Sequence, residues 1–566
     1  MSLSVRACRY GLVTTALLAA IALAYLIAAG NAAASRRGAG AGGQTATPIK
    51  HLVVIFDENV SFDHYFGTYP RAANRAGEPR FHAAPGTPSV NGLRGSLLFN
   101  NPNLSNPQRL DRSQALTCDQ DHGYTAEQDA FDRGAIDRFV QDTGNGETVK
   151  QCTGKSSGHS PNFAVMDYYD GNTVTALWNY AQHYALSDNS FGTNFGPSTP
   201  GAFNVASGNT YGAICGPTSA VYSGTPCTAT PGTASAGPGL SQPAGTGTVY
   251  GDADPNYDVC SATEDGNSAA GTIQMGGQNI GNFLDEAHMT WGWFEGGFAS
   301  PGYVSGKPKT DDLSTVCAGT HRNIGGAKVK DYIPHHEPFE YYASTANRKH
   351  LPPQSVAMIG HQDRANHQYD LRDFWAAADN GNLPSVSYVK AAAYQDGHAG
   401  YSDPLDEQRF LVRTIDRLER LPSWSSTAVI VNYDDSDGWY DHQRGPIITQ
   451  SQTALDTLTG TGMCGSNPAR VPQNRSHAPE EARCGVGPRL PLLVISPYAK
   501  HNFADGTFTT QTSVVRFIED NWLGGKRLGN GSADVWSGSL NNMFSFLHAA
   551  SGRLLLSPNT GEPIRR

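Results

Sequence analysis

Residues 51–67, HLVVIFDENVSFDHYFG, constrain the fold of this chain more than any other stretch. Residues 52–56 are apolar and largely β-branched, which predicts a short buried strand. The run stops at Asp57-Glu58-Asn59, at the carboxyl end of that strand. Ligands bind at this end in open α/β sheets, because the loops diverge there and leave a crevice. Carboxylate and amide oxygens suit a hard or borderline cation, although Asx residues also commonly end strands and cap helices.

A second segment repeats this arrangement. Residues 428–433 are an apolar strand candidate, and the adjacent carboxylates of Asp434 and Asp435 follow them. Neighbouring carboxylates repel each other unless protons or a cation intervene. One divalent metal ion held by both strand ends is the economical explanation, with Glu58 and Asn59 completing the ligands. Oxygen ligands fit Ca²⁺, Mg²⁺, Mn²⁺ or Fe, and histidines elsewhere leave Zn²⁺ open. The alternative is an ordinary acidic loop solvated by water.

Strands and helices alternate along the rest of the chain. This pattern predicts an α/β fold, with one large domain over residues 48–562 and a mainly parallel central sheet. Residues 210–258 are dominated by Gly, Ser, Thr, Pro and Ala, which indicates an insertion such as a lid or an irregular flap over a site. We expect further strands at 289–294, 385–389 and 490–496, and helices at 125–142, 174–186, 280–288, 406–421 and 513–522.

The first 34 residues have the pattern of an export signal. Arg6 and Arg9 form a basic start, residues 12–29 an apolar run, and residues 32–34 a small-residue cleavage site. The run is also long enough to be an uncleaved membrane anchor, but its alanine content and the site after it favour cleavage. We therefore expect a secreted or periplasmic protein, with a disordered linker at 35–47.

Cysteine usage agrees with export. Eight cysteines follow the signal, and an even number in an exported chain predicts disulfides. We expect Cys118–Cys152, which would pin the predicted helix 125–142, and Cys464–Cys484, which flank a polar loop. The remaining four cannot be paired from the sequence; they are Cys215, Cys227, Cys260 and Cys317.

Ser198 is the candidate nucleophile. It follows the constrained Gly196-Pro197 turn of FGPST. A serine presented on a rigid turn can act as a nucleophile, and the amides of a following helix would help to hold an anion. A serine beside Gly and Pro is more often a turn residue or a cap, and Thr199 offers the same hydroxyl chemistry one residue later. The chain has no G-x-S-x-G elbow, so a metal ion would have to activate the hydroxyl in place of a His–Asp pair.

Four histidines lie in loops rich in Gly, Pro or Asp. They are His122 in CDQDHGYTAEQ, His335 and His336 in IPHHEPF, and His398 in YQDGHAGYSDP. None has the HExxH spacing of a helical zinc site. Each alone could be an exposed loop residue, but together they could bind phosphate oxygens and protonate a departing alkoxide.

These motifs occur in an order that resembles one known family. ENVSFDHYFG, CDQDHGYTAEQDAF, FGPSTPG, IPHHEPF, YDDSDGWYDH and RLPLLVISPYAK follow one another over residues 51–562. They are similar to the bacterial phosphoesterase family of phospholipases C and respiratory-burst-inhibiting acid phosphatases, within the alkaline-phosphatase-like superfamily. The resemblance implies a three-layer sandwich with a mainly parallel central sheet and long loop insertions. It also implies that Ser198 is the nucleophile and that the four histidines surround the phosphate. The implied metal ligands are Glu58, Asn59, Ser198, Asp434 and Asp435.

One departure from the family pattern bears on the substrate. Many members read Asp-Glu-His-Gly-Gly where this chain has DDSDG at 434–438, so Ser436 replaces the usual histidine. The aspartate pair resembles the acid-phosphatase branch. We therefore expect a secreted metal-dependent hydrolase of phosphate monoesters that uses a phosphoserine intermediate. The alternatives are a phospholipase C that cleaves phosphatidylcholine-type diesters and a catalytically inactive secreted binding protein.

The expected partners follow from composition and from this resemblance. Charged residues make up 16% of the chain and the formal charge is −10, with no basic patch, which argues against nucleic acid as a partner. We expect a phosphate ester or phospholipid substrate, at most transient contact with a membrane surface, and no obligate protein partner.

Overall fold

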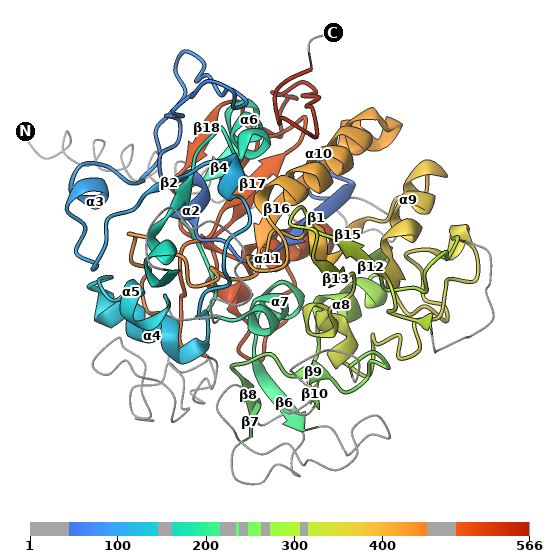
Figure 1. Ribbon diagram of the computed structural model, residues 1–566. Coiled ribbons are helices and arrows are strands. Elements are labelled where there is room, and N and C mark those ends of the chain that lie inside the picture. Colours follow the sequence, from blue (N-terminus) through green and yellow to red (C-terminus); the bar gives the residue numbers. More distant parts are fainter. Residues whose placement is uncertain are drawn as a thin grey trace, which may run out of the picture. The chain divides into compact units, whose positions relative to one another are not determined.

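The core of the computed structural model is an eight-stranded sheet (Figure 1). The structure describes residues 45–144, 161–215, 234–236, 247–261, 272–305, 315–449 and 483–564. Neighbouring strands of the sheet are parallel, except that β17 runs antiparallel to both of its neighbours. In order across the sheet, the strands are β14 (Gln368–Asp370), β11 (Trp291–Glu295), β15 (Val386–Lys390), β1 (His51–Asp57), β16 (Thr427–Tyr433), β17 (Leu492–Ile495), β4 (Ala185–Ser187) and β18 (Phe503–Asp505).

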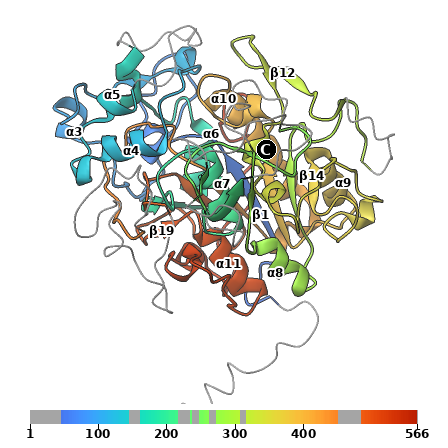
Figure 2. The same ribbon diagram turned by 90° about the horizontal axis from the view of Figure 1, so that it is seen from below.

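Helices cover both faces of this sheet (Figure 2). Contacts between elements agree with one layer of helices on each face. Tyr388 of β15 donates a hydrogen bond to the Val205 carbonyl of α7 (Ser198–Ala206) in one layer. In the other layer, Arg417 of α10 (Pro404–Arg420) lies over the Trp375 ring of α9 (Leu371–Asp379). The result is the expected α/β sandwich with a mainly parallel sheet. One layer contains α6 (Thr175–His183), α9 (Leu371–Asp379) and α10 (Pro404–Arg420), and the other contains α7 (Ser198–Ala206), α8 (Ile280–Glu286) and α11 (Ser513–Trp522).

Strands β1 and β16 lie side by side at the centre, and burial on both faces explains their continuous apolar runs. Their register pairs Asp57 with Tyr433. The residues that follow, Glu58 and Asp434, therefore emerge next to each other at the same edge of the sheet. The other expected elements at 289–294, 385–389, 280–288, 406–421 and 513–522 correspond to β11, β15, α8, α10 and α11.

Two predicted helices are wrong in part. The helix expected at 125–142 is interrupted, because α4 (Tyr124–Phe131) ends at Asp132 and Arg133, both in the left-handed region at φ 38° and 55°. A second short helix, α5, covers Phe139–Asp142. The helix expected at 174–186 ends at His183, and the residues after it form β4. Pairing of β4 with β17 on one side and with β18 on the other decides the conformation of this segment, and such tertiary contacts override local propensity.

The region predicted to be a lid or an irregular flap, 210–258, contributes ordered strands in its described part. They belong to a second sheet, in the order β7-β8-β6-β10-β9, next to α7. Phe203 of α7 packs in one cluster with Ala213 and Val249 of this sheet. The small sheet therefore supports the helix that begins at Ser198. Its strands are β6 (Tyr211–Cys215), β7 (Ala234–Ala236), β8 (Gly247–Val249), β9 (Asp254–Pro255) and β10 (Thr272–Met275).

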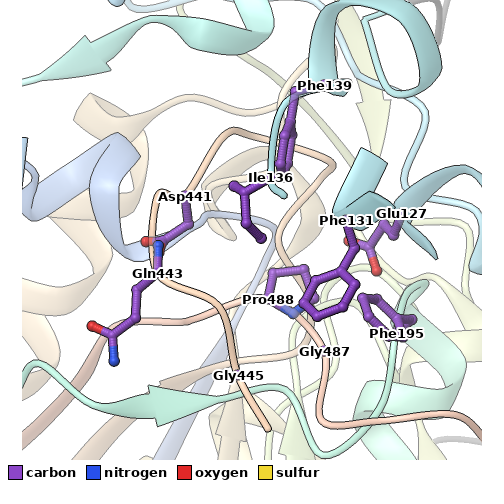
Figure 3. Close-up of a pocket in the computed structure, with 10 residues that line it drawn as sticks. All are labelled: Glu127, Phe131, Ile136, Phe139, Phe195, Asp441, Gln443, Gly445, Gly487 and Pro488. Atoms are coloured by element: carbon purple, nitrogen blue, oxygen red, sulfur yellow. The ribbon is translucent and has the colours of Figure 1, made fainter. Parts of the chain in front are cut away.

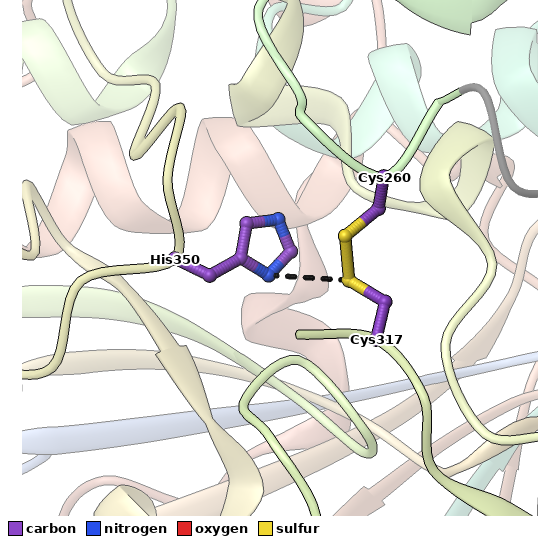
Figure 4. A group of neighbouring side chains, drawn as sticks. All are labelled: Cys260, Cys317 and His350. Atoms are coloured by element: carbon purple, nitrogen blue, oxygen red, sulfur yellow. Dashed lines mark hydrogen bonds between the residues drawn. A yellow bond between two sulfur atoms is a disulfide. The ribbon is translucent and has the colours of Figure 1, made fainter. Parts of the chain in front are cut away.

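One disulfide is complete within the described residues, and it joins Cys260 to Cys317 (Figure 4). These two are among the four cysteines that could not be paired from the sequence. His350 lies beside it, with Nδ1 3.5 Å from the Cys317 sulfur and Nε2 2.8 Å from Asp258. Because the two sulfurs are bonded to each other, this group does not provide thiolates for a metal ion.

Cys118 and Cys484 are also disulfide-bonded. The partners predicted for them, Cys152 and Cys464, lie outside the described residues, as does Cys227, so these pairings stay predictions.

The predicted export signal at 1–34, and all but the last three residues of the linker at 35–47, also lie outside the described ranges. In the part of the chain that the structure describes, no helix has the length and apolar character needed to cross a bilayer. All of the elements above belong to one compact unit, Thr47–Arg566.

Candidate active site

The candidate site is built where β1 and β16 end. The Asp434 amide donates to the Asp57 carbonyl at 3.2 Å, and the Val60 amide donates to the Asp435 carbonyl at 3.1 Å. These backbone bonds continue the pairing of the two strands by a few residues beyond the sheet. As a result, the carboxylates of Glu58, Asp434 and Asp435 converge in the interior, where each residue is at most 5% exposed.

Helix α7 brings Ser198 to these carboxylates. Its first turn packs against the loop after β16 so closely that a Cβ on Gly201 would lie 2.1 Å from the Asp434 carbonyl oxygen. Only glycine allows this approach. The Ser198 hydroxyl lies 3.3 Å from Glu58 Oε2 and 3.2 Å from Asp435 Oδ2.

Thr199, the rival hydroxyl, faces elsewhere. Its Oγ1 donates to the His335 carbonyl at 3.4 Å, and its amide donates to the Asp252 carboxylate at 2.9 Å. Of the two adjacent hydroxyls, Ser198 is therefore the one directed toward the strand-end carboxylates.

The oxygen atoms around Ser198 fit a divalent cation. Among the described residues, buried Asp434 Oδ2 and Asn59 Oδ1 have no hydrogen-bond partner. Burial and the negative charge of Glu58 raise the pKa of Asp434 well above its ordinary value, and burial raises that of Asp435 to about 6. A hard cation would relieve both the repulsion and the missing partners, and carboxylate and amide oxygens are the ligands it prefers.

Two histidines near the site have their Nδ1 atoms committed to the backbone. His122 Nδ1 donates to the Gln120 carbonyl at 2.8 Å, and His398 Nδ1 donates to the Ala399 carbonyl at 2.6 Å. Their rings lie 5.7 Å apart. These bonds place a proton on Nδ1 of each ring and leave Nε2 for other partners. His122 Nε2 lies 3.5 Å from the Asn59 amide nitrogen.

The surroundings of His122 favour its charged form. Burial opposes a charge on the ring, but Asp435, Asp437 and Asp119 outweigh it and raise the pKa of His122 well above its usual value. A protonated imidazole beside Asp437 and close to Asp435, at the edge of this site, is suited to act as a general acid.

The remaining pair of histidines differs from these two. His336 Nδ1 lies 3.1 Å from Glu58 Oε1, and burial lowers the pKa of His336 well below its usual value, so its ring is neutral at ordinary pH. His335 lies beside it at 4.5 Å between ring centroids, with Nδ1 3.6 Å from Asp254. The structure thus places His336 in contact with the candidate metal ligand Glu58, whereas the His335 ring lies near Asp254 and its carbonyl accepts from Thr199.

Sequence reasoning missed Lys390, which ends β15 and contacts Glu58 through its ammonium group. Burial alone would lower the pKa of Lys390, but the carboxylates of Glu58, Asp434 and Asp396 outweigh it and raise that pKa. The signal was present, because Lys390 follows an apolar run just as Glu58 and Asp434 do. The strand predicted at 385–389 stopped one residue short of it.

Glu127 was also missed. One oxygen of its carboxylate accepts a hydrogen bond from the Gly196 amide, and the other accepts one from the Ser436 hydroxyl at 2.5 Å. It therefore connects the turn before Ser198 to the loop that carries Asp434 and Asp435. Ser436, which departs from the family pattern, is the partner in this link.

The surroundings of Glu127 are mostly apolar on one side (Figure 3). The carboxyl group lies beside a cavity of about 20 Å³, whose walls include Phe131, Ile136, Phe139 and Phe195. Burial, reinforced by the charge of Asp435, raises the pKa of Glu127 to about 7.

Comparisons with known proteins show which family the chain resembles. The model of the Phosphoesterase family matches residues 49–523. A non-hemolytic phospholipase C of Burkholderia pseudomallei is 23% identical over 495 residues, which cover 84% of this chain and 55% of the relative. A non-hemolytic phospholipase C of Pseudomonas aeruginosa is 31% identical over 144 residues, 24% of this chain and 20% of the relative. Phospholipase C B of Mycobacterium tuberculosis (strain ATCC 25618 / H37Rv) is 31% identical over 163 residues, 26% and 27% of the two chains. The chain thus spans about half the length of the first of these relatives and smaller parts of the others.

Proposed function

We propose that this chain, which belongs to the Phosphoesterase family, hydrolyses phosphate monoesters with Ser198 as its nucleophile. The observation that supports this most directly is the position of the Ser198 hydroxyl at the start of α7, within 3.3 Å of Glu58 and 3.2 Å of Asp435. Two carboxylates would not gather around a hydroxyl in the protein interior without a cation or protons to offset their charge.

We assign the metal site to the oxygens that converge there. The ligands would be Glu58, Asn59, Ser198, Asp434 and Asp435. A divalent cation bound by them would lower the pKa of the Ser198 hydroxyl and offset charge that develops on the phosphate oxygens. We propose the alkaline-phosphatase-like superfamily as the origin of this fold, on the motifs that resemble it and on the mainly parallel sheet between two helical layers.

Each residue of the site then has its own role in the proposed reaction. The Ser198 hydroxyl gives up its proton to solvent, and its oxygen forms a bond to phosphorus while the bond to the leaving oxygen breaks and that oxygen departs with the electron pair. His122, which carries a proton and has Nε2 available, donates that proton to the leaving alkoxide. His398 and His335 hold phosphate oxygens, and His336 keeps Glu58 in place. A water molecule then attacks the phosphoserine and gives a proton to the now neutral His122. The bond between phosphorus and the Ser198 oxygen breaks, that oxygen takes up a proton from solvent, and phosphate is released.

A second candidate function is a phospholipase C that cleaves phosphatidylcholine-type diesters. It is favoured by the relatives, each of which is named a phospholipase C. The same nucleophile and metal would serve, and the product would carry the phosphorylated head group. We also propose that the protein is exported, on the basis of the predicted signal at 1–34. That segment lies outside the described residues.

Turnover by matched variants tests the nucleophile and separates the two substrates. p-Nitrophenyl phosphate reports on monoesters and p-nitrophenylphosphorylcholine on diesters. Ser198→Ala is expected to lower kcat by about 10⁴-fold or more, because it removes the group that forms the covalent bond. The other four proposed ligands should keep the metal ion bound. Thr199→Ala is the control, since its hydroxyl faces the His335 carbonyl, and kcat should stay within about tenfold.

Acid quench with ³²P-labelled substrate should leave phosphate on Ser198. Label on Thr199 or on a histidine, or normal turnover by Ser198→Ala, would overturn the nucleophile assignment. Turnover of neither substrate by the wild-type protein would favour the third possibility, a binding protein without activity.

A further inference from the structure

Lys390 places a fixed positive charge inside the candidate metal site. It is the last residue of β15, the parallel neighbour of β1, and its side chain is 1% exposed. Its ammonium group contacts Glu58 Oε1. Strand pairing also sets Lys390 opposite Glu295 of β11, so the residue is held between two strands and cannot easily leave the site.

The two oxygens of Glu58 have different partners. Oε1 meets Lys390 and His336 Nδ1, the latter at 3.1 Å, whereas Oε2 faces the Ser198 hydroxyl at 3.3 Å. A carboxylate that bridges two metal ions commonly gives one oxygen to each. Here only Oε2 is directed toward the position beside Ser198, so Glu58 offers one oxygen to a metal ion.

The other side of Glu58 has the composition of a second metal site. Ligand atoms of Glu58, His336 and Asp396 lie within 4.8 Å of one another, and all three residues are buried. Phosphatases with two metal ions hold them about 3.5–4 Å apart and use both to stabilise the attacking and leaving oxygens. In this chain the ammonium of Lys390 already contacts the Glu58 oxygen that such a second ion would need.

We propose that Lys390 is a positioning residue that makes this a site for one divalent metal ion, by supplying the second positive charge where another ion would bind. This inference rests on the metal site of the proposed function. The ammonium holds Glu58 with Oε2 toward Ser198 and offsets the charge of Asp396. Removal of the ammonium would leave Glu58, His336 and Asp396 free to bind a second ion.

Counting bound metal tests the idea without reference to turnover. The purified protein is stripped with chelator and dialysed against Mn²⁺. Bound metal per chain is then measured by mass spectrometry, and electron paramagnetic resonance shows whether the ions are magnetically coupled. The wild type should bind one Mn²⁺ with an uncoupled spectrum. Lys390→Ala should bind two, with the coupled spectrum of ions a few ångströms apart.

Two further variants serve as controls. Lys390→Arg keeps the charge and should bind one ion. Lys526→Ala removes a lysine whose side chain is 57% exposed and pairs with Glu286 at the surface, and it should also bind one. If Lys390→Ala does not fold, Lys390→Gln replaces it, because the amide keeps most of the side-chain volume without the charge.

The outcomes separate this inference from the proposed function. Two ions in the wild type, or one ion in folded Lys390→Ala or Lys390→Gln, would overturn the role of Lys390 and leave the metal site standing. No bound ion in the wild type would overturn both. A labelled Ser198 together with an unchanged ratio in the variants would support the nucleophile and refute only the role of Lys390.

Discussion

Replacement of Glu127 tests whether the turn that presents Ser198 is held by a carboxylate from a distant motif. Glu127 accepts hydrogen bonds from the Gly196 amide and from the Ser436 hydroxyl. Glu127→Ala removes both acceptors and leaves two buried donors without a partner. Each stranded donor costs about 1–3 kcal/mol, so the loss is at most about 6 kcal/mol.

Relief of electrostatic repulsion offsets part of that loss in stability. Glu127 lies in surroundings that raise the pKa of its carboxyl group to about 7, and its removal relieves repulsion with Asp435. We therefore expect the free energy of unfolding to fall by about 2–4 kcal/mol. The larger effect should be on kcat, because a shift of about 1 Å in a reacting group can lower a rate by about 100-fold.

Glu127→Gln is the matched variant. Its amide oxygen can still accept from the Gly196 amide, and its amide nitrogen can donate to the Ser436 oxygen. It should keep the free energy of unfolding within about 1 kcal/mol of the wild type and kcat within about tenfold. Glu286→Ala, a change at a side chain that is 55% exposed, is the surface control.

The assays are urea unfolding, kcat and KM for p-nitrophenyl phosphate, and metal content. KM and metal content should change little in Glu127→Ala, because Glu127 is not among the assigned ligands. Wild-type kcat in that variant, or an equal loss in Glu127→Gln, would refute the link between this carboxylate and the Ser198 turn.

Two further predictions concern stability away from the site. Burial raises the pKa of Glu419 to about 7 from an ordinary 4.5, with its carboxylate accepting from the Tyr184 hydroxyl at 2.5 Å. The stability this group contributes is therefore complete below about pH 4.5 and is lost as the pH rises through about 7, by at most about 3 kcal/mol. Urea unfolding at pH 5 and pH 8 should show this decline, and an equal decline in Glu419→Gln would contradict it. The Cys260–Cys317 disulfide closes a loop with a sequence separation of 57, so Cys260→Ser should lower the free energy of unfolding by about 4 kcal/mol in the chain-entropy description; a loss below about 1 kcal/mol would show that the bridge does not constrain the unfolded chain.

The two central strands and the polar residues at their ends could be predicted from the local sequence. β1 and β16 were predictable because strands buried on both faces need continuous apolar runs, and the polar residues after them stand out against those runs. That both sets meet at one edge follows from the parallel sheet that the alternating pattern predicts. The pairing of Asp57 with Tyr433 makes the two strands direct neighbours, and this the sequence did not reveal.

The conformation of other segments could not be predicted from the neighbouring residues alone. Residues 185–187 continue a helical pattern but form β4, because pairing with β17 and β18 stabilises the extended backbone. The helix predicted at 125–142 ends early, where Asp132 and Arg133 adopt left-handed conformations. For residues 185–187 the deciding interactions come from strands that are distant along the chain, so a window of neighbouring residues does not contain them.

The sequence by itself determined the α/β class, the central strands and the motifs that carry Ser198, the histidines and the strand-end carboxylates. Family membership, which the match over residues 49–523 shows, was already visible in the order of those motifs. Only the tertiary structure decided which groups touch: the contact of Lys390 with Glu58, the link from Glu127 to Gly196, and the side of the turn that Ser198 faces. The physical reason is that residue type and local pattern set the conformation of each segment, whereas these contacts depend on strand order and on the close packing of α7 against the loop after β16.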